Sequence, residues 1–144
     1  MNITYGSAGT EDIAPLYALC RQLIEDYENL ELIDLDNVLG WVRRKLETCI
    51  TDYTVIYADG IKAGYYHFYT NADGKFELDD LYIFPEFQGR GIGSMAIGKC
   101  CASVNEPVML YVFAKNQRAV SLYQRLGFSI VKTINDSRYI MERN

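Results

Sequence analysis

The spacing of apolar residues predicts two amphipathic helices early in the chain. Between positions 13 and 46, apolar residues recur every three or four positions, which is the repeat of a helix that packs on one face. The first stripe consists of Ile13, Leu16, Tyr17, Cys20, Ile24 and Tyr27. The second stripe consists of Leu35, Val38, Leu39, Val42 and Leu46. On the second helix we expect the intervening charged residues to face water, namely Arg43, Arg44, Lys45 and Glu47.

Capping residues place the starts of these two helices. Thr10 and Asp12 are candidates for the first N-cap, and Pro15 fits the first turn of a helix that begins after Asp12. Asp34 or Asp36 is the candidate cap of the second helix. The sequence therefore predicts helix starts near residues 13 and 35.

Strand-like runs account for most of the remaining chain. They alternate or are rich in Val, Ile, Tyr and Phe, which is typical of sheet residues. The predicted strands cover residues 2–7, 53–59, 61–69, 75–84, 107–113, 128–133 and 138–142. Three turns separate neighbouring strands: Asp59-Gly60, residues 71–74 and Asn135-Asp136.

Two further helices lie among the later strands, over residues 91–104 and 116–126. Gly127 is placed to end the second of them, with Phe128 making the hydrophobic contact that accompanies such a cap. The element order is then β, α, α, β, β, β, α, β, α, β, β. This order predicts an α/β (α+β) fold in which a mixed sheet carries helices on both faces.

Length and charge narrow the class of protein. A chain of 144 residues with 49% hydrophobic content is large enough for one domain with its own core, and we expect residues 1–144 to form a single domain. The formal net charge of −5 argues against binding along a nucleic-acid backbone, which requires a basic face. It is compatible with attracting a cationic substrate.

The cysteines and the hydropathy pattern limit other functions. Cys20, Cys49, Cys100 and Cys101 show no metal-ligand spacing, and His67 is the only histidine, so we expect no metal site. No apolar run approaches the roughly 20 residues of a membrane span, and nothing resembles a signal peptide. We therefore expect a cytoplasmic protein with reduced cysteines.

A glycine-rich turn between a strand and a helix is the most informative stretch of the sequence. It reads Gln88-Gly89-Arg90-Gly91-Ile92-Gly93-Ser94. Glycines allow the backbone to approach a ligand closely, and a helix N-terminus presents unpaired N–H groups to an anion. Arg90 adds positive charge, and Gln88 can fix the loop through its side chain. Three glycines in five residues favour a diphosphate cradle over a simple flexible turn.

Two nucleotide-binding motifs compare poorly with this stretch. The chain contains no G-x-x-x-x-G-K-[ST] string, which disfavours a nucleotide triphosphatase. Residues 91–96 match the loose dinucleotide pattern G-x-G-x-x-[GA], but that pattern requires an acidic residue about 20 positions later. Phe113-Ala114-Lys115 stands there instead, so a dinucleotide-dependent oxidoreductase ranks lower.

Two segments together resemble the GNAT superfamily of N-acetyltransferases. Gln88-x-x-Gly91-x-Gly93 matches the acyl-CoA signature [RQ]-x-x-G-x-[GA] of that superfamily. The strand before it, over residues 81–87, and the last strand, over residues 139–142, are also similar to the family's. The second motif of the superfamily is similar to residues 116–128, which read Asn116-x-x-Ala119-x-x-Leu122-Tyr123-x-x-Leu126-Gly127-Phe128. The resemblance covers about residues 77–142, because the first half agrees only in element order.

The resemblance implies a fold and a binding mode. Two central strands splay apart like a V, and the pantetheine arm of acetyl-CoA runs between the strand that ends near residue 84 and the strand over 108–113. The diphosphate lies on the amides of Gly89, Arg90, Gly91, Ile92, Gly93 and Ser94, beside Gln88. Backbone groups of Tyr82, Ile83 and Phe84 pair with the arm or polarise the thioester carbonyl, and Asn116 contacts the arm.

Tyr123 has two interpretations. The resemblance implies that it donates a proton to the departing thiolate. A tyrosine with a pKa near 10 is suited to that role, because the conjugate acid of a thiolate has a pKa of about 8.5 to 10. However, Ala119, Leu122, Tyr123 and Leu126 also form a helical stripe, so periodicity alone favours a core residue, and only the resemblance favours the acid.

Glu77 and Asp79 are candidate bases for the amine's proton. If the strand alternates regularly, they share a face with Leu81 and Ile83, and Asp80 points to the other face, although a bulge would alter this. The alternative is a solvated strand end. Three other residues have open roles. They are Asn116, which also fits a helix N-cap; His67, for which a local hydrogen bond is favoured over a place in an acceptor pocket; and Trp41, a candidate for the acceptor wall.

Three functions follow from these features. The favoured one is an acetyl-CoA-dependent N-acetyltransferase, in which the amine attacks the thioester directly in a ternary complex. Its acceptor would be a small-molecule amine or a protein N-terminus. The second is a non-catalytic acyl-CoA-binding sensor module, and the third is the oxidoreductase. We expect a monomer or a homodimer, with no nucleic-acid or membrane partner and no metal.

Overall fold

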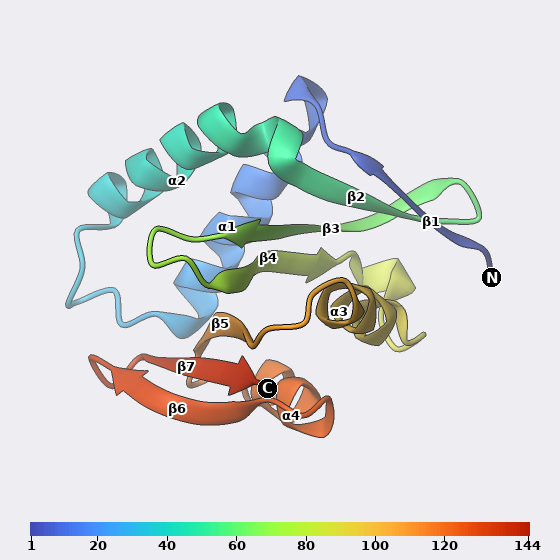
Figure 1. The fold of residues 1–144 in the computed structure, drawn as a ribbon. Coiled ribbons are helices and arrows are strands. Elements are labelled where there is room, and N and C mark those ends of the chain that lie inside the picture. Colours follow the sequence, from blue (N-terminus) through green and yellow to red (C-terminus); the bar gives the residue numbers. More distant parts are fainter.

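The computed structural model describes all of residues 1–144 and contains every predicted helix and strand in the predicted order (Figure 1). The strands are β1 (Ile3–Ser7), β2 (Tyr53–Ala58), β3 (Ile61–Thr70), β4 (Phe76–Ile83), β5 (Val108–Phe113), β6 (Ser129–Ile134) and β7 (Arg138–Arg143). The α-helices are α1 (Ile13–Tyr27), α2 (Leu35–Cys49), α3 (Ile92–Ala102) and α4 (Gln117–Arg125). No helix is both long enough and apolar enough to cross a membrane.

One seven-stranded sheet organises the fold, in the order β1-β2-β3-β4-β5-β7-β6. All neighbours are antiparallel except β4 and β5, which run parallel in the middle of the sheet. These two central strands pair only at Phe76 with Val108 and at Glu77 with Met109. Beyond those pairs they diverge, so the predicted splay is confirmed, and the rest of β4 has no strand partner on that edge.

The turns follow from residues that tolerate left-handed backbone. Asp59 and Gly60, between β2 and β3, have φ values of 52° and 81°. Asn135 and Asp136, between β6 and β7, have φ values of 50° and 58°. Positive φ at two successive residues is the geometry of the tightest hairpins, and Asn, Asp and Gly adopt it most readily. Both hairpin predictions are thus confirmed for the expected reason.

Helices cover both faces of the sheet, as predicted, and each pair buries its own cluster. On one face, α3 and α4 pack on strand residues in a cluster that includes Ile56, Leu78, Ile92, Ile97, Leu110, Val120 and Met141. On the other face, α1 and α2 bury Leu16, Cys20, Val42, Leu46, Tyr53, Val55 and Tyr65. The splay between β4 and β5 is the place where the sheet no longer separates these two layers.

Asp12 precedes α1 as expected, but its side chain does not cap the helix. The carboxylate is buried and accepts hydrogen bonds from Lys62 Nζ (2.8 Å), the Tyr65 hydroxyl (2.6 Å) and the Gly9 amide (2.9 Å). It therefore ties the start of α1 to β3. Burial alone would raise the pKa of Asp12, but the bonds from Lys62, Tyr65 and Gly9 outweigh it and hold the pKa below its ordinary value.

We expect Asp12→Asn to lower the free energy of unfolding by about 2 kcal/mol at pH 7, because hydrogen bonds to a charged group are lost. Since the folded-state pKa of Asp12 is depressed, its contribution is present above about pH 4 and disappears as the pH falls through the folded-state pKa. Urea titrations should therefore show a gap between wild type and variant that narrows in acid. Asp73→Asn, at an exposed turn, is the control. A gap that is independent of pH would contradict this account.

Candidate active site

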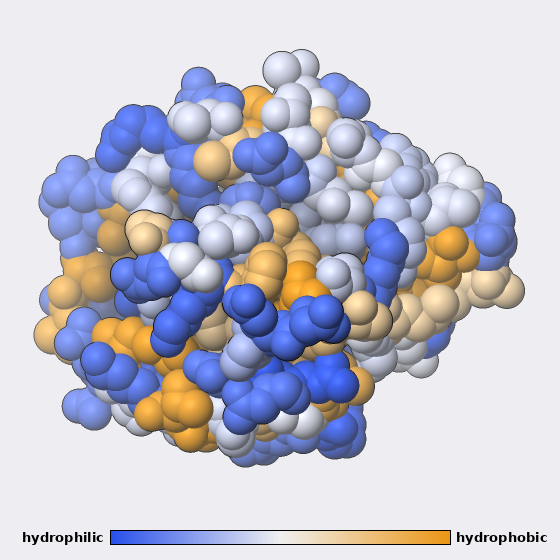
Figure 2. All heavy atoms as spheres, viewed as in Figure 1, coloured by the Kyte–Doolittle hydropathy of each residue, from blue (hydrophilic) through white to orange (hydrophobic).

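A cleft of about 1410 Å³ opens where β4 and β5 diverge. Its walls come from α1, α2, β3, β4, the glycine segment 88–94, β5 and α4. Figure 2 shows hydrophobic residues in the middle of this face, between hydrophilic ones, and further hydrophobic residues toward its lower left and right edges. The cleft thus joins the layer of α1 and α2 to the layer of α3 and α4.

The glycine segment lies at one end of the cleft and leads into α3. Gly89 and Gly91 have φ values of 77° and 79°, a conformation that other residues adopt only with strain. The first main-chain hydrogen bond of the helix runs from the Met95 amide to the Gly91 carbonyl (3.0 Å). None of the six consecutive amides from residue 89 to residue 94 donates a hydrogen bond within the protein. Six unpaired donors at the N-terminus of an eleven-residue helix are groups that can hydrogen-bond to an anion.

Gln88 anchors this segment, as its sequence position suggested. Its side-chain nitrogen donates to the Ile83 carbonyl (2.9 Å), and its oxygen accepts from Arg118 (3.3 Å). The end of β4, the glycine segment and α4 are therefore held together. Two residues predicted to bind the cofactor do not line the cleft: Arg90 stacks over the Phe87 ring at 5.6 Å, and Phe84 packs with the cluster under α1 and α2.

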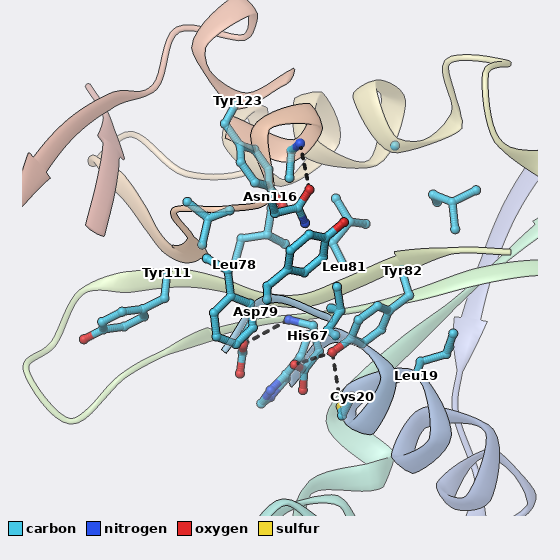
Figure 3. A pocket seen from close by; sticks show the side chains of 18 of the residues that line it. Leu19, Cys20, His67, Leu78, Asp79, Leu81, Tyr82, Tyr111, Asn116 and Tyr123 are labelled. Carbon is cyan, nitrogen blue, oxygen red and sulfur yellow. Dashed lines mark hydrogen bonds between the residues drawn. The ribbon is translucent and has the colours of Figure 1, made fainter. Parts of the chain in front are cut away.

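Asn116 and Tyr123 line the cleft on the side of α4, across from β4 (Figure 3). Asn116 Oδ1 accepts from the Ala119 amide (3.2 Å), which confirms the predicted N-cap of α4, while its side-chain nitrogen has no protein partner. The Tyr123 ring makes an edge contact with Phe128 at 5.8 Å, and its hydroxyl makes no hydrogen bond with the protein. Burial raises the pKa of Tyr123 to about 12, with the charge of Asp79 adding to the effect, so the hydroxyl keeps its proton at neutral pH.

A bulge in β4 changes which residues face the acceptor side of the cleft. Between the pairs Tyr65–Tyr82 and His67–Asp79, β4 contains one more residue than β3, and Asp80 has a φ of 49°. The prediction from regular alternation was therefore wrong in two respects. Asp80 turns to the same side as Asp79, and Leu81 and Ile83 pack in the opposite layer, with α3.

Lys45 meets both aspartates, so the prediction that it faces water was also wrong. Its Nζ atom lies 2.6 Å from Asp79 Oδ2 and 2.8 Å from Asp80 Oδ2. The hydroxyls of Tyr53 and Tyr82 also donate to Asp80. The sequence held one signal for this contact, because Lys45 lies seven positions after Val38 and three after Val42, at the edge of the apolar stripe of α2.

The protonation of this cluster depends on burial and on Lys45. Burial raises the pKa of Asp79 to about 6, and the charge of Asp80 adds to the rise against the opposing effect of Lys45. Burial acts on Asp80 in the same direction, but the Lys45 ammonium and the two tyrosine hydroxyls outweigh it and hold the pKa of Asp80 below its ordinary value. One partly buried cation is thus shared by two carboxyl groups with unequal pKa values.

The other candidates of the acceptor side are also present in the cleft. Glu77 is buried and accepts from the Asn71 amide (3.1 Å). His67 is buried between two tyrosine rings, and the local hydrogen bond expected for it is not formed. Trp41, on α2, lines the cleft with 58% of its surface exposed, so it is placed to contact an incoming molecule. No group of three or more His, Cys, Asp or Glu side chains could hold a metal ion.

Comparison with known proteins gives the family. The sequence profile of the acetyltransferase (GNAT) family matches residues 12–128, which include every residue that lines the cleft except Arg138. The chain belongs to this family of acetyltransferases. The dinucleotide alternative is thereby set aside, because the glycine segment on which it rested lies inside the matched residues.

Similar proteins carry names of the same class. The chain is 36% identical over 72 residues to a thialysine N-epsilon-acetyltransferase from Bos taurus, covering 44% of this chain and 40% of that protein. It is 34% identical over 61 residues to a mycothiol acetyltransferase from Propionibacterium freudenreichii, covering 40% of this chain and 20% of that protein. The matched segment spans less than half the length of each relative.

Solved structures share the fold over nearly the whole chain. A PaiA N-acetyltransferase from Thermoplasma acidophilum, in complex with coenzyme A, superposes with a TM-score of 0.68 at 22% identity, covering 100% of this chain and 99% of that one. An acetyltransferase from Thermus thermophilus superposes with a TM-score of 0.74 at 20% identity, covering 99% and 97%. At this identity the likeness defines the fold.

Proposed function

We propose that this protein transfers an acetyl group from acetyl-CoA to a primary amine, by direct attack of the amine in a ternary complex. The observation that carries the proposal is the run of six unpaired amides, residues 89–94, at the head of the split between β4 and β5. An anion held there would place the remainder of a long, thin molecule between the two strands. The diphosphate and pantetheine arm of coenzyme A have that shape and charge.

The unpaired edge of β4 supports the same binding mode. From Leu78 to Ile83 this edge has no strand partner. Apart from the Ile83 carbonyl, which accepts from Gln88, and the Asp80 amide, which donates to Asp79, its main-chain groups on this edge are available to an extended chain of amides such as pantetheine. The Asn116 side-chain nitrogen, which has no protein partner, faces the same space from the other wall. The arm would complete the hydrogen bonding of the split sheet, and an amide near Ile83 would polarise the thioester carbonyl.

Tyr123 is suited to protonate the departing thiolate. The neutral amine nitrogen forms a bond to the acetyl carbon, and the carbon–sulfur bond then breaks with its electron pair on sulfur. The Tyr123 hydroxyl is free of protein partners and protonated at neutral pH, so it can donate to the sulfur and recover a proton from the new amide nitrogen. Its raised pKa does not prevent this, because the burial that raises it would also disfavour a free thiolate beside the hydroxyl.

Charge and shape on the acceptor side favour an amine that carries a positive charge when it binds. The acidic side chains of this part of the cleft are Glu28, Asp52, Glu77, Asp79 and Asp80, and Lys45 neutralises only part of their charge. Trp41 and Tyr69 add aromatic surface on which an ammonium group can lie. A small-molecule amine and a protein N-terminus both meet these requirements, and the thialysine enzyme among the relatives is named for an amine acceptor.

The proposal is tested by following thiol release from acetyl-CoA against a panel of diamines, amino acids and peptides with free N-termini. We expect at least one amine to give turnover. Thiol release should show no initial burst, because no acyl-enzyme forms, and its rate should depend on the concentrations of both acetyl-CoA and the amine, as a ternary complex requires. Calorimetry with coenzyme A alone is run in parallel. Tight binding of coenzyme A without turnover of any amine would instead favour the acyl-CoA sensor module.

Gly91→Ala should weaken binding of coenzyme A about tenfold. A side chain at φ 79° costs about 1 to 2 kcal/mol, and relief of that strain would turn the amide of residue 91 away from the anion. The matched control is Gly98→Ala, within the same helix and with no atom near its added methyl group, which we expect to stabilise the protein and leave binding unchanged. Equal affinity of both variants, measured by calorimetry, would argue against the amide cradle.

A further inference from the structure

His67 occupies the centre of a row that crosses three strands on the acceptor face. Strand register pairs it with Tyr53 of β2 on one side and with Asp79 of β4 on the other. Its ring stacks on Tyr53 at a centroid distance of 4.4 Å and on Tyr69, two residues further along β3, at 4.2 Å. Two nearly parallel tyrosine rings therefore fix the plane of the imidazole. His67, Tyr69 and Asp79 line the cleft, and Figure 3 shows His67 and Asp79 there.

Neither nitrogen of this imidazole is used by the protein. Nδ1 is completely buried and has no hydrogen-bond partner. Nε2 has no protein partner either, but it is not sealed off in the same way, and His67 contributes to the cleft wall. A buried polar ring without any hydrogen bond is unusual in a folded protein, because the loss of water has nothing to offset it. The geometry therefore points to a group that enters the cleft and meets this ring.

The other candidate bases are already engaged. Asp79 is bound to Lys45 at 2.6 Å, and Glu77 accepts from Asn71 at 3.1 Å. Of these three cleft residues, only His67 makes no hydrogen bond or ion pair with the rest of the protein. A primary amine that binds as an ammonium ion must lose one proton before it can attack a thioester. The imidazole can therefore take this proton without competing with a hydrogen bond or an ion pair inside the protein.

We propose that His67 accepts the proton of the bound ammonium group and so generates the nucleophilic amine. This inference rests on the proposed acetyl transfer. The proton moves from the ammonium nitrogen to imidazole Nε2, which leaves a neutral amine and an imidazolium ion. The amine nitrogen then bonds to the acetyl carbon, the carbon–sulfur bond breaks with its electron pair on sulfur, and the sulfur takes the second amine proton by way of Tyr123. After product release, the imidazolium returns its proton to water.

The surroundings of His67 suit a base that is neutral at rest. Burial and the Lys45 ammonium hold the pKa of His67 below its ordinary value, against the opposing charges of Asp80 and Asp52. The remaining groups that face the ring are Tyr53, Tyr69 and Asp79, from β2, β3 and β4. Once protonated, the ring is stabilised by the faces of both tyrosines and by the neighbouring carboxylates.

The test compares two acceptors in His67→Gln and His67→Phe, the second of which keeps the aromatic stack. With an alkylamine, which is charged at neutral pH, we expect kcat to fall about 10²-fold in both variants. With 2,2,2-trifluoroethylamine, which is uncharged at neutral pH, the loss should be less than about threefold, because no proton has to be removed first. Affinity for coenzyme A, measured by calorimetry, should stay within about twofold of wild type if the fold is intact.

Equal losses with both amines would assign His67 a structural role and overturn the proposal. An unchanged alkylamine rate in the His67 variants, with a loss in Glu77→Gln or Asp79→Asn, would assign the base to a carboxylate instead. In wild type, the rate should also fall as the pH drops through the pKa of His67, and this acidic limb should be absent from both variants. A limb that persists in them counts against the proposal.

An NMR measurement that does not depend on turnover tests the role of His67 separately from the proposed acetyl transfer. Because His67 is the only histidine, its imidazole signals in an NMR titration need no assignment. We expect a pKa below 6.5 in the free protein and a change in the imidazole signals when an alkylamine is added together with coenzyme A. If wild type transfers acetyl to no amine, the proposed function fails. The proposed contact between the amine and His67 is overturned if the imidazole signals also stay unchanged when the alkylamine and coenzyme A are added.

Discussion

Tyr123→Phe should lower kcat by about 10³-fold and leave the affinity for coenzyme A unchanged. The variant loses only the hydroxyl, which makes no hydrogen bond within the protein, and it retains the edge contact with Phe128. A phenylalanine cannot supply a proton to the departing thiolate, so the carbon–sulfur bond must break with a full charge left on sulfur. Single-turnover measurements with saturating amine should assign the loss to the chemical step.

The control for this variant is Tyr139→Phe, which changes a tyrosine that packs against the same core cluster outside the cleft. Both variants should unfold within about 0.5 kcal/mol of wild type. Since the pKa of Tyr123 is raised to about 12, its ionisation should not limit the wild-type rate at any pH below about 10. Undiminished transfer by Tyr123→Phe would show that Tyr123 is a core residue, as its helical spacing alone also allowed.

Lys45→Met should lower the free energy of unfolding by about 3 kcal/mol at pH 7, the largest stability change that we expect from a single substitution. The ammonium group is the only cation in contact with Asp79 and Asp80, whose side chains are 25% and 13% exposed. Without it, two neighbouring carboxylates remain largely buried and unpaired. The bonds from Tyr53 and Tyr82 to Asp80 satisfy part of the hydrogen bonding but supply no charge.

The pH dependence of this loss identifies its cause. Without Lys45, the folded-state pKa of Asp79 should rise further above the unfolded value of about 3.9, and the pKa of Asp80, now held below that value, should rise as well. The added destabilisation then develops as the pH rises above about 4 and diminishes in more acidic solution, where both groups are protonated. Urea titrations at pH 4.5 and pH 7 should show the smaller loss at pH 4.5.

Two controls accompany Lys45→Met. Arg44→Met removes an exposed cation from the same helix and should change stability by less than about 0.5 kcal/mol. The double variant Lys45→Met/Asp80→Asn removes one of the unpaired charges and should recover part of the lost stability. If the double variant is less stable than Lys45→Met, the contacts that Asp80 makes with the tyrosines matter more than its charge.

Local sequence determined the elements and both motifs of this protein. The stripes of α1 and α2 and the left-handed turn residues Asp59, Gly60, Asn135 and Asp136 specified the order of helices and strands. The glycines of residues 89–93 specified a turn with positive φ before α3, and Asn116 specified the cap of α4. These features depend on residues that are close in sequence, so propensity and period suffice to predict them.

Tertiary structure decided the acceptor side of the cleft. One additional residue in β4 turns Asp80 to the side of Asp79, and regular alternation cannot predict where such a bulge falls. Lys45 then reaches both carboxylates from a helix more than 30 residues away in sequence, and the register of three strands stacks His67 between Tyr53 and Tyr69. Contacts of this kind depend on register and on the packing of helix against sheet, which are fixed only when the whole chain is folded.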